Sequence, residues 1–413
     1  MTELLERGWT PILSGRDPEK LSLSAAAHPK LEVRPASIDS PASLDRALAG
    51  AAAVINCAGP FLDTATPVIE TAMRAGVHYL DVTPEQRAVL AAFDRFADAA
   101  RDAGIVVAPA MAFFGGLGDL LATAAMGDWA TADEITVVYA LDSWKPTLGT
   151  RLTGQRNTGR RFVFTKNNLE FVADPPPKRA WNFPEPFGSQ DVESPCLSEI
   201  VTISRHLPVS EVHAFMTLPP LRDIHEPETP SPIASDERGR SSQTFLLDVV
   251  ASKGSEEHYA SARGQDIYAI SASIVVEATQ RIVTGLAKKS GGVAAGEAFD
   301  ARGCRSPYLR LRWRAAYAAT FKRFPHSRML HQRRVPFLLV SWKCSTHRAH
   351  LRTRLRSTVV NNDAALCANG ANKSSGSRTS NHNSAKGALP VACNFVRMGW
   401  SASRPFRWSI VDP

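Results

Sequence analysis

Three short segments carry residue types that bind phosphorylated ligands. Ser14, Gly15 and Arg16 follow one apolar run, residues 56–61 (NCAGPF) follow a second, and Asp81 follows a third. An arginine guanidinium forks onto a phosphate and stacks on an adenine ring, and a glycine lets the backbone approach a ligand closely. We therefore expect contacts to a nucleotide-like cofactor.

The apolar runs predict strands that bring these segments to one edge of a sheet. Residues 51–55 and 77–80 flank about a dozen helix formers, and such a strand–helix–strand unit is parallel. The carboxyl ends of parallel strands face the ligand crevice. Alternating strands and helices predict a doubly wound α/β sheet with helices on both faces. The other expected strands are residues 10–14, 31–34 and 105–108, and the helices are residues 1–8 (its last turns), 40–48, 85–103 and 116–126.

The start of the chain lacks one part of a Rossmann-like nucleotide-binding sheet. No G-x-G-x-x-G precedes residues 10–14, and the glycines at 115–118 and 291–292 lack that spacing. We expect the first strand and its glycine-rich loop to be missing, through loss of about 20 residues.

The pattern changes after about residue 131, where proline-rich loops separate strands without intervening helices. This predicts an α+β second domain and a division into residues 1–130, 131–300 and 301–413. The expected strands are residues 135–141, 161–165, 200–204, 243–251 and 258–263, followed by a helix over residues 266–286.

Charge divides the chain at about residue 301. Of 48 basic and 40 acidic residues, residues 301–413 hold 21 and two, which leaves residues 1–300 with a net charge of −11. The tail also has scattered tryptophans, four cysteines and no sustained periodicity, so we interpret it as disordered or as a frameshifted translation. The alternative is a basic arm that binds nucleic acid. The spacing of Cys344, His347 and His350 is irregular for zinc, and no metal site is predicted.

Nothing in the sequence indicates a membrane span or a secretory signal. No run of about 18 apolar residues occurs, and the acidic start MTELLERGW has no apolar core. Residues 1–300 contain only Cys57 and Cys196, which does not resemble a disulfide framework, so a cytoplasmic protein is expected.

Each candidate site residue has an ordinary structural alternative. Arg16 either accommodates the 2′-phosphate of NADP or is a solvated turn residue. Asp81 either orients a cofactor or caps a helix, and Asp119 is either a cap or a substrate ligand. Arg151 and Arg156 either bind an acidic substrate or lie in an exposed loop. We predict cofactor contacts at Ser14, Gly15, Arg16, Asn56, Ala58, Gly59, Pro60, Phe61 and Asp81, and substrate contacts at Asp119, Arg151 and Arg156.

These segments resemble the saccharopine dehydrogenase-like NADP-binding family, in its bacterial saccharopine dehydrogenase or trans-acting enoyl reductase branch. The similar pieces are residues 14–17 (SGRD), 54–61 (VINCAGPF), 75–85 (AGVHYLDVTPE), 109–121 (PAMAFFGGLGDLL) and 291–301 (GGVAAGEAFDA). The resemblance implies a Rossmann domain and a second domain that shapes the substrate pocket or forms a homodimer contact. By analogy Arg16 touches the 2′-phosphate, and residues 56–61 line the ribose–nicotinamide side.

The function expected from this resemblance is NADP-dependent hydride transfer to or from an unidentified small molecule. The rival is an inactive remnant that binds cofactor weakly or not at all, because the phosphate loop is missing. A nucleic-acid binder rests on the tail alone and is not expected. The sequence identifies no general acid or base.

Overall fold

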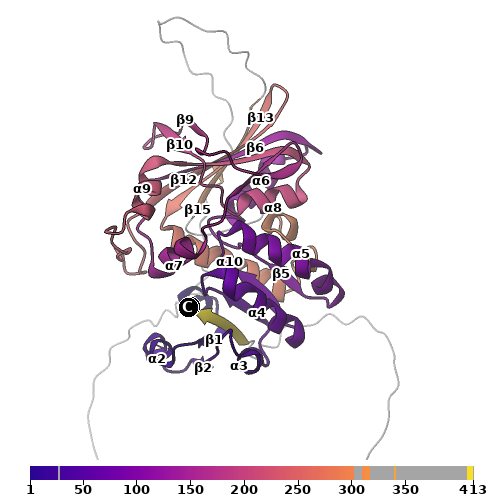
Figure 1. Ribbon diagram of the computed structural model, residues 1–413, viewed down its shortest axis with the longest axis vertical. Helices are drawn as coiled ribbons and strands as arrows, with labels where there is room; N and C mark the ends of the chain where they lie inside the picture. Colours follow the sequence, from indigo (N-terminus) through magenta and orange to yellow (C-terminus); the bar gives the residue numbers. More distant parts are fainter. Residues whose placement is uncertain (27, 302–308, 317–338, 341–406, 413) are drawn as a thin grey trace, which may run out of the picture. The chain divides into compact units, whose positions relative to one another are not determined.

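The structure is a computed structural model, and it describes residues 1–26 and 28–301 together with the backbone of residues 309–316, 339–340 and 407–412. All of these residues belong to one compact unit. Its first part is a seven-stranded parallel sheet in the order β14-β5-β4-β3-β17-β1-β2 (Figure 1). The strands are β1 (Thr10–Gly15), β2 (Glu32–Val33), β3 (Ala53–Asn56), β4 (His78–Asp81), β5 (Val106–Ala108), β14 (Gly291–Gly292) and β17 (Arg407–Asp412).

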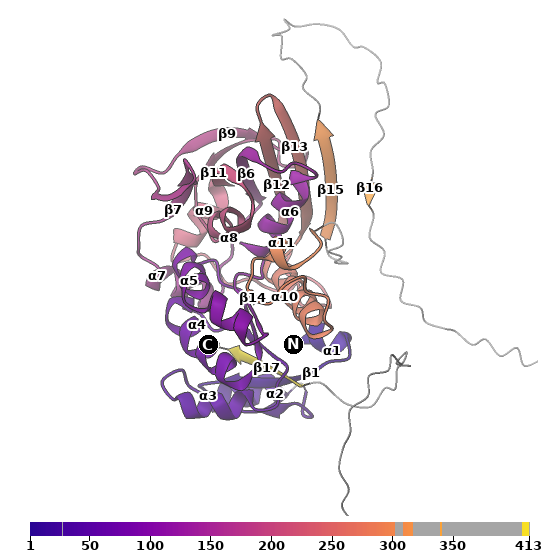
Figure 2. The same ribbon diagram turned by 90° about the vertical axis from the view of Figure 1, so that its right-hand side faces the viewer.

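Helices cover both faces of this sheet, as the strand–helix alternation predicts. The strand β3 is buried along its length, with Ala53 and Ile55 in one core and Val54 in the other. Figure 2 shows α3, α4 and α5 on one side of the sheet and α1 and α10 on the other. The helices of this part are α1 (Thr2–Glu6), α2 (Pro18–Ala26), α3 (Pro41–Leu48), α4 (Phe61–Ala75), α5 (Gln86–Asp102), α6 (Gly116–Met126), α10 (Ile267–Val283) and α11 (Ala295–Ala298).

The strand–helix–strand unit predicted from residues 51–80 is confirmed. Strands β3 and β4 pair in parallel with Asn56 opposite Asp81, and α4 connects them. The helix α4 begins directly after Pro60 and ends at Gly76, which adopts the left-handed conformation that favours glycine. The carboxyl ends of both strands therefore lie at the same edge of the sheet.

The position between β1 and β3 is filled from the far end of the chain. The strand β17 is parallel to both neighbours, with Thr10 opposite Arg407 and Ala53 opposite Trp408. Sequence analysis expects the strand at this position to be missing. The structure instead places residues 407–412 there.

A second sheet of ten strands contains mainly antiparallel pairs, in the order β16-β15-β13-β12-β6-β11-β10-β9, and the hairpin β7–β8 pairs with β11. An apolar core fills the space between this sheet and the helices α6, α8 and α10. The strands are β6 (Ala132–Leu141), β7 (Phe162–Thr165), β8 (Asn168–Phe171), β9 (Lys178–Asn182), β10 (Ser189–Glu193), β11 (Val209–Thr217), β12 (Thr244–Lys253), β13 (Glu256–Gln265), β15 (Leu309–Ala316) and β16 (Leu339–Val340), and the helices are α7 (Leu148–Arg156), α8 (Glu199–His206) and α9 (Leu218–His225).

One secondary-structure prediction is wrong, because residues 200–204 belong to the helix α8. Every residue from Glu199 to Ile203 is buried, and a short apolar run of this kind has no period that separates a strand from a buried helix. The expectation of strands without intervening helices fails for the same region, since α7, α8 and α9 lie between strands.

The proposed division at residues 130 and 300 stays a prediction. Most of the tail, including Cys344, His347 and His350, lies outside the described residues. Among the helices of the part of the chain that the structure describes, none is long and apolar enough to cross a membrane.

Candidate functional site

The turns singled out in the sequence meet along one edge of the parallel sheet. Strand β1 ends at Gly15, β3 at Asn56 and β4 at Asp81. Ser14 and Asn56 both lie opposite Val411 of β17, and Asn56 lies opposite Asp81. The structure therefore brings these predicted cofactor residues to a single rim, where an open parallel sheet binds its ligand.

At the β1 end the rim is open and basic. A hollow of about 270 Å³ is lined by residues of the β1–α2 turn and the first turns of α2, including Arg16 and Lys20. Both side chains are exposed. Asp17 accepts hydrogen bonds from the backbone N–H groups of Glu19 (3.0 Å) and Lys20 (3.2 Å), so it caps α2. Its carboxylate is thereby turned to the helix, and the two cations are left to face a ligand.

Ser14 precedes the first residue of this hollow in the chain and does not line it. Its side chain is fully buried, and its hydroxyl has no hydrogen-bond partner among the residues that the structure describes. A buried hydroxyl without a partner is costly, so a ligand atom that bonds to it would be stabilising.

The loop after β3 is held by internal hydrogen bonds. The Asn56 amide donates to the hydroxyls of Tyr79 (3.2 Å) and Thr64 (3.3 Å), and its oxygen accepts from the N–H of Ala58 (3.0 Å). The Gly59–Pro60 peptide bond is cis. The donor and acceptor groups of the Asn56 side chain thus form hydrogen bonds that hold the loop. A direct contact of Asn56 with the cofactor stays a prediction.

The helix α7 packs directly on this loop. A Cβ atom at Gly59 would lie 2.4 Å from the hydroxyl of Thr153 and 3.8 Å from the carbonyl oxygen of Gly149. Glycine is required here because α7 comes so close. The Arg156 guanidinium pairs with Asp63 in the first turn of α4, at 2.8 Å.

The buried Asp81 side chain connects the loops that follow β4 and β5. One carboxylate oxygen accepts the N–H groups of Thr83 (3.0 Å) and Ala110 (2.8 Å), and the other accepts the Tyr79 hydroxyl (2.8 Å). Burial raises the pKa of Asp81 to about 6, although these hydrogen bonds favour the ionised form. Asp81 fixes the ends of β4 and β5, and its predicted contact with the cofactor remains untested.

Sequence reasoning missed Glu85, which it placed at the start of a helix. The Glu85 carboxylate is buried and accepts the N–H groups of Phe61 (2.7 Å) and Leu62 (3.2 Å) at the N-terminus of α4. Burial raises its pKa to about 7, against the effect of these two donors. The signal available in the sequence was the pair of carboxylates, Asp81 and Glu85, that lie four residues apart in DVTPE. Its partners lie 23 and 24 residues earlier, which no local pattern reveals.

A second buried acid, Glu199, lies at the start of α8. One oxygen accepts the N–H of Gly115 (3.3 Å), and the other has no hydrogen-bond partner among the described residues. Burial raises the pKa of Glu199 to about 7. The carboxyl groups of Glu85 and Glu199 are therefore both able to hold a proton near neutral pH.

The three predicted substrate residues have internal partners. Asp119 is fully buried and accepts from the His206 ring (2.6 Å) and the Gly296 N–H (2.7 Å). Burial opposes the charged ring, but the Asp119 carboxylate outweighs it and raises the pKa of His206. Arg151 donates to the carbonyl oxygens of Glu226 and Thr229. Substrate contacts by Asp119, Arg151 and Arg156 stay predictions.

The parallel sheet, its two layers of helices and the basic rim define a nucleotide-binding domain of the doubly wound α/β class. Within that class, residues 3–107 match the family described as the saccharopine dehydrogenase NADP binding domain. This part of the chain is therefore similar to an NADP-binding domain.

The chain is similar to several solved structures. The apo histidine-tagged saccharopine dehydrogenase (L-Glu forming) from Saccharomyces cerevisiae superposes with a TM-score of 0.51 at 11% identity, over 73% of this chain and 93% of that one. An engineered D-amino acid dehydrogenase bound to NADP+ gives 0.36 at 12% identity over 70% and 94% of the two chains. The C. glutamicum DAP dehydrogenase in complex with DAP gives 0.35 at 12% identity over 70% and 93%. No curated protein matches the chain.

The residues present fit one end of NADP. The hollow at Arg16 and Lys20 suits the adenosine phosphate. The pyrophosphate end differs, because β17 occupies the strand position next to β1.

Proposed function

We propose that the protein is an NADP-dependent oxidoreductase that passes hydride between nicotinamide and a small-molecule substrate. The observation that carries this proposal is the basic hollow at the end of β1, inside the region that matches an NADP-binding domain. A fork of two N–H groups on Arg16 recognises a 2′-phosphate, and Lys20 adds a second cation from the next turn. NADPH would therefore be preferred over NADH.

The remaining residues of the rim would position the cofactor. The bound cofactor would donate hydride as NADPH or accept it as NADP+. Asn56 and Glu85 hold the loop of residues 57–61 from two sides, which gives the nicotinamide side a fixed wall. The helix α7 lies against Gly59 on that wall and would limit access of water.

The test is NADPH and NADH affinity of the full chain, measured by fluorescence titration. Loss of a charge-assisted contact is worth about 1.5–3 kcal/mol, so Arg16→Ala should weaken NADPH binding by about 10- to 100-fold and leave NADH unchanged. Arg95→Ala is the matched control, because Arg95 is an exposed arginine on α5 that pairs with Glu70. Equal losses for both nucleotides in Arg16→Ala would contradict the assignment.

The rival proposal is that the protein is an inactive remnant of an oxidoreductase, which does not turn over a substrate. The observation that favours it is β17, which stands where the phosphate loop would begin. A dissociation constant of about 1 mM corresponds to a binding free energy of only about 4 kcal/mol. If the chain does not bind NADPH even at about 1 mM, the result would support the inactive remnant and contradict the oxidoreductase. A homodimer and the absence of nucleic-acid binding remain predictions.

A further inference from the structure

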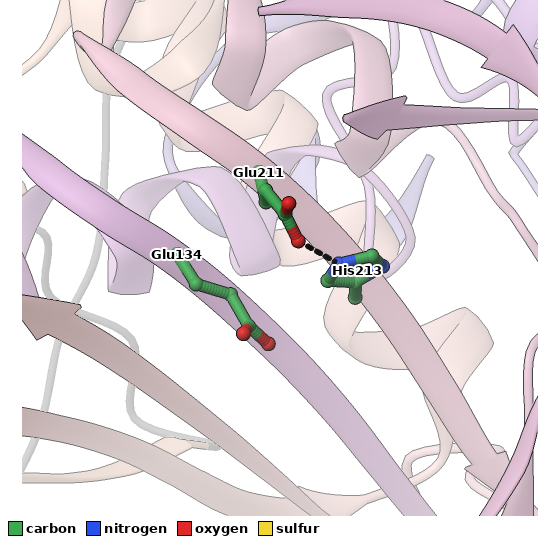
Figure 3. A group of neighbouring side chains, drawn as sticks. All are labelled: Glu134, Glu211 and His213. Atoms are coloured by element: carbon green, nitrogen blue, oxygen red, sulfur yellow. Dashed lines mark hydrogen bonds and ion pairs between the residues drawn. The ribbon is translucent and has the colours of Figure 1, made fainter. Parts of the chain in front are cut away.

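Three potential metal ligands project together from the second sheet, away from the cofactor rim. Glu134 lies on β6, and Glu211 and His213 lie on the neighbouring strand β11 (Figure 3). The two strands are parallel, with Glu211 opposite Glu134 and His213 opposite Thr136. Because alternate residues of a strand share a face, the three side chains stand on the same surface. One donor atom from each lies within 4.8 Å of the other two.

Two threonines orient the carboxylates. The hydroxyl of Thr136 donates to one oxygen of Glu134, and the hydroxyl of Thr165 donates to Oε1 of Glu211 (3.4 Å). Oε2 of Glu211 lies 3.0 Å from Nε2 of His213. Each carboxylate thus has one oxygen held by an outer partner, which is the arrangement that steadies metal ligands.

Two of the three side chains are carboxylates that lie opposite each other on the paired strands. Two carboxylates directly opposite each other on adjacent strands repel. Within the part of the chain that the structure describes, neither Glu134 nor Glu211 forms an ion pair with a lysine or arginine. Arg179 is the nearby cation. It attracts Glu134 electrostatically, and its guanidinium lies over the rings of Phe215 (4.0 Å) and Trp181 (4.9 Å). A divalent cation would remove the repulsion.

We propose that Glu134, Glu211 and His213 bind a divalent transition-metal ion, with Zn²⁺ as the best match, and that water completes the coordination. An imidazole nitrogen beside two carboxylates favours Zn²⁺ over Mg²⁺ or Ca²⁺. Bonds of about 2.0–2.2 Å place two donors on one ion about 3–4 Å apart. The His213–Glu211 spacing meets this, and rotation of the Glu134 side chain closes the remaining gap.

Binding exchanges one hydrogen bond for the metal. The Nε2 of His213 gives up its N–H contact with Glu211 and presents a lone pair to the ion, while the ring carries its proton on Nδ1. The ion then joins β6 to β11. It lies on the second sheet and takes no part in hydride transfer, so it is independent of the proposed function.

The experiment uses the full chain, freed of metal with EDTA and dialysed, with Zn²⁺ titrated by calorimetry and Co²⁺ followed by visible absorption. We expect one equivalent of Zn²⁺ and visible Co²⁺ bands. His213→Ala and Glu134→Gln should weaken Zn²⁺ by more than the roughly 10- to 100-fold that an outer partner is worth. His225→Ala is the matched control, because His225 is an exposed histidine at the end of α9.

The variant Thr136→Val distinguishes a preorganised metal site from nonspecific binding of the ion. It keeps the shape of the side chain and removes only the hydroxyl that holds Glu134. It should weaken Zn²⁺ by about 10-fold. Circular dichroism of each variant shows that the fold is retained. Unchanged affinity in His213→Ala relative to His225→Ala, or displacement of Zn²⁺ by equal Mg²⁺, would overturn the proposal.

Discussion

The two ends of the cofactor rim use polar residues in opposite ways. At the β1 end, Arg16 and Lys20 are exposed around a hollow, and the Ser14 hydroxyl has no partner among the described residues. At the β3–β4 end, Asn56 and Asp81 are buried; Asn56 donates and accepts hydrogen bonds within the fold, and Asp81 accepts them. The first end is free to bind a ligand, whereas the second fixes the loops that a ligand would touch.

This difference shows that a polar residue at a strand end has two distinct roles. A side chain that lies in water costs little and remains available. A buried polar side chain destabilises the fold unless its hydrogen bonds are made. Substitutions at the two ends should therefore affect different measurements, stability at one and cofactor affinity at the other.

The largest effect is expected at Asp81. Asp81→Ala removes the acceptor of three donors, and each buried donor left unpaired costs about 1–3 kcal/mol, so the free energy of unfolding should fall by about 3–5 kcal/mol. Urea denaturation measures it. Asp81→Asn keeps an oxygen for the Thr83 and Ala110 N–H groups and should lose less. Equal losses in the two variants would show that the hydrogen bonds do not determine the cost.

The next effect is a pH dependence from Glu85. Its pKa rises from 4.5 to about 7 on folding, so between these values the folded state binds more protons than the unfolded state. Stability from this group is therefore greatest below pH 4.5 and falls as the pH rises to 7, by about 3 kcal/mol in total. Glu85→Gln should remove this contribution, while the contributions of Asp81 and Glu199, whose pKa values are also raised, remain. Urea denaturation at pH 5 and pH 8 measures the slope, and a slope equal to that of the wild type in Glu85→Gln would contradict the assignment.

A smaller effect is expected where α7 meets the loop. Gly59→Ala places a Cβ 2.4 Å from the Thr153 hydroxyl, and overpacking of this kind costs about 1–3 kcal/mol. Thr153→Ala removes the obstructing hydroxyl, so the double variant should recover most of the loss. The comparison is a double-mutant cycle in thermal unfolding. Additive losses would mean that the two residues are not in contact.

The smallest change in stability is expected at Arg16. An exposed side chain away from a packed contact changes stability by no more than about 0.5 kcal/mol. Arg16→Ala should unfold at the wild-type urea midpoint while losing NADPH affinity. A loss of stability comparable to that of Asp81→Ala would remove the distinction between the two ends of the rim.

The parallel half of the fold could be predicted because its signals are local. The run of residues 77–80 predicts β4, and residues 116–126 predict α6 with the same bounds. The second sheet was harder. Residues 200–204 form a helix, not a strand, because a short run buried on all sides has no useful period. Strands β8, β9, β10 and β11 escaped prediction because none of them carries the sustained apolar alternation that marks a half-buried strand.

The sequence alone determined that a basic turn and a Gly-Pro loop follow parallel strands, because strand periodicity and turn chemistry are set by neighbouring residues. Only the tertiary structure decided which polar groups are used up inside the fold. The partners of Glu85 and of Asp119 lie 23 to 177 residues away, and burial and desolvation depend on those distant partners. The same reason applies to Glu134, Glu211 and His213, which meet only because β6 and β11 pair in one register.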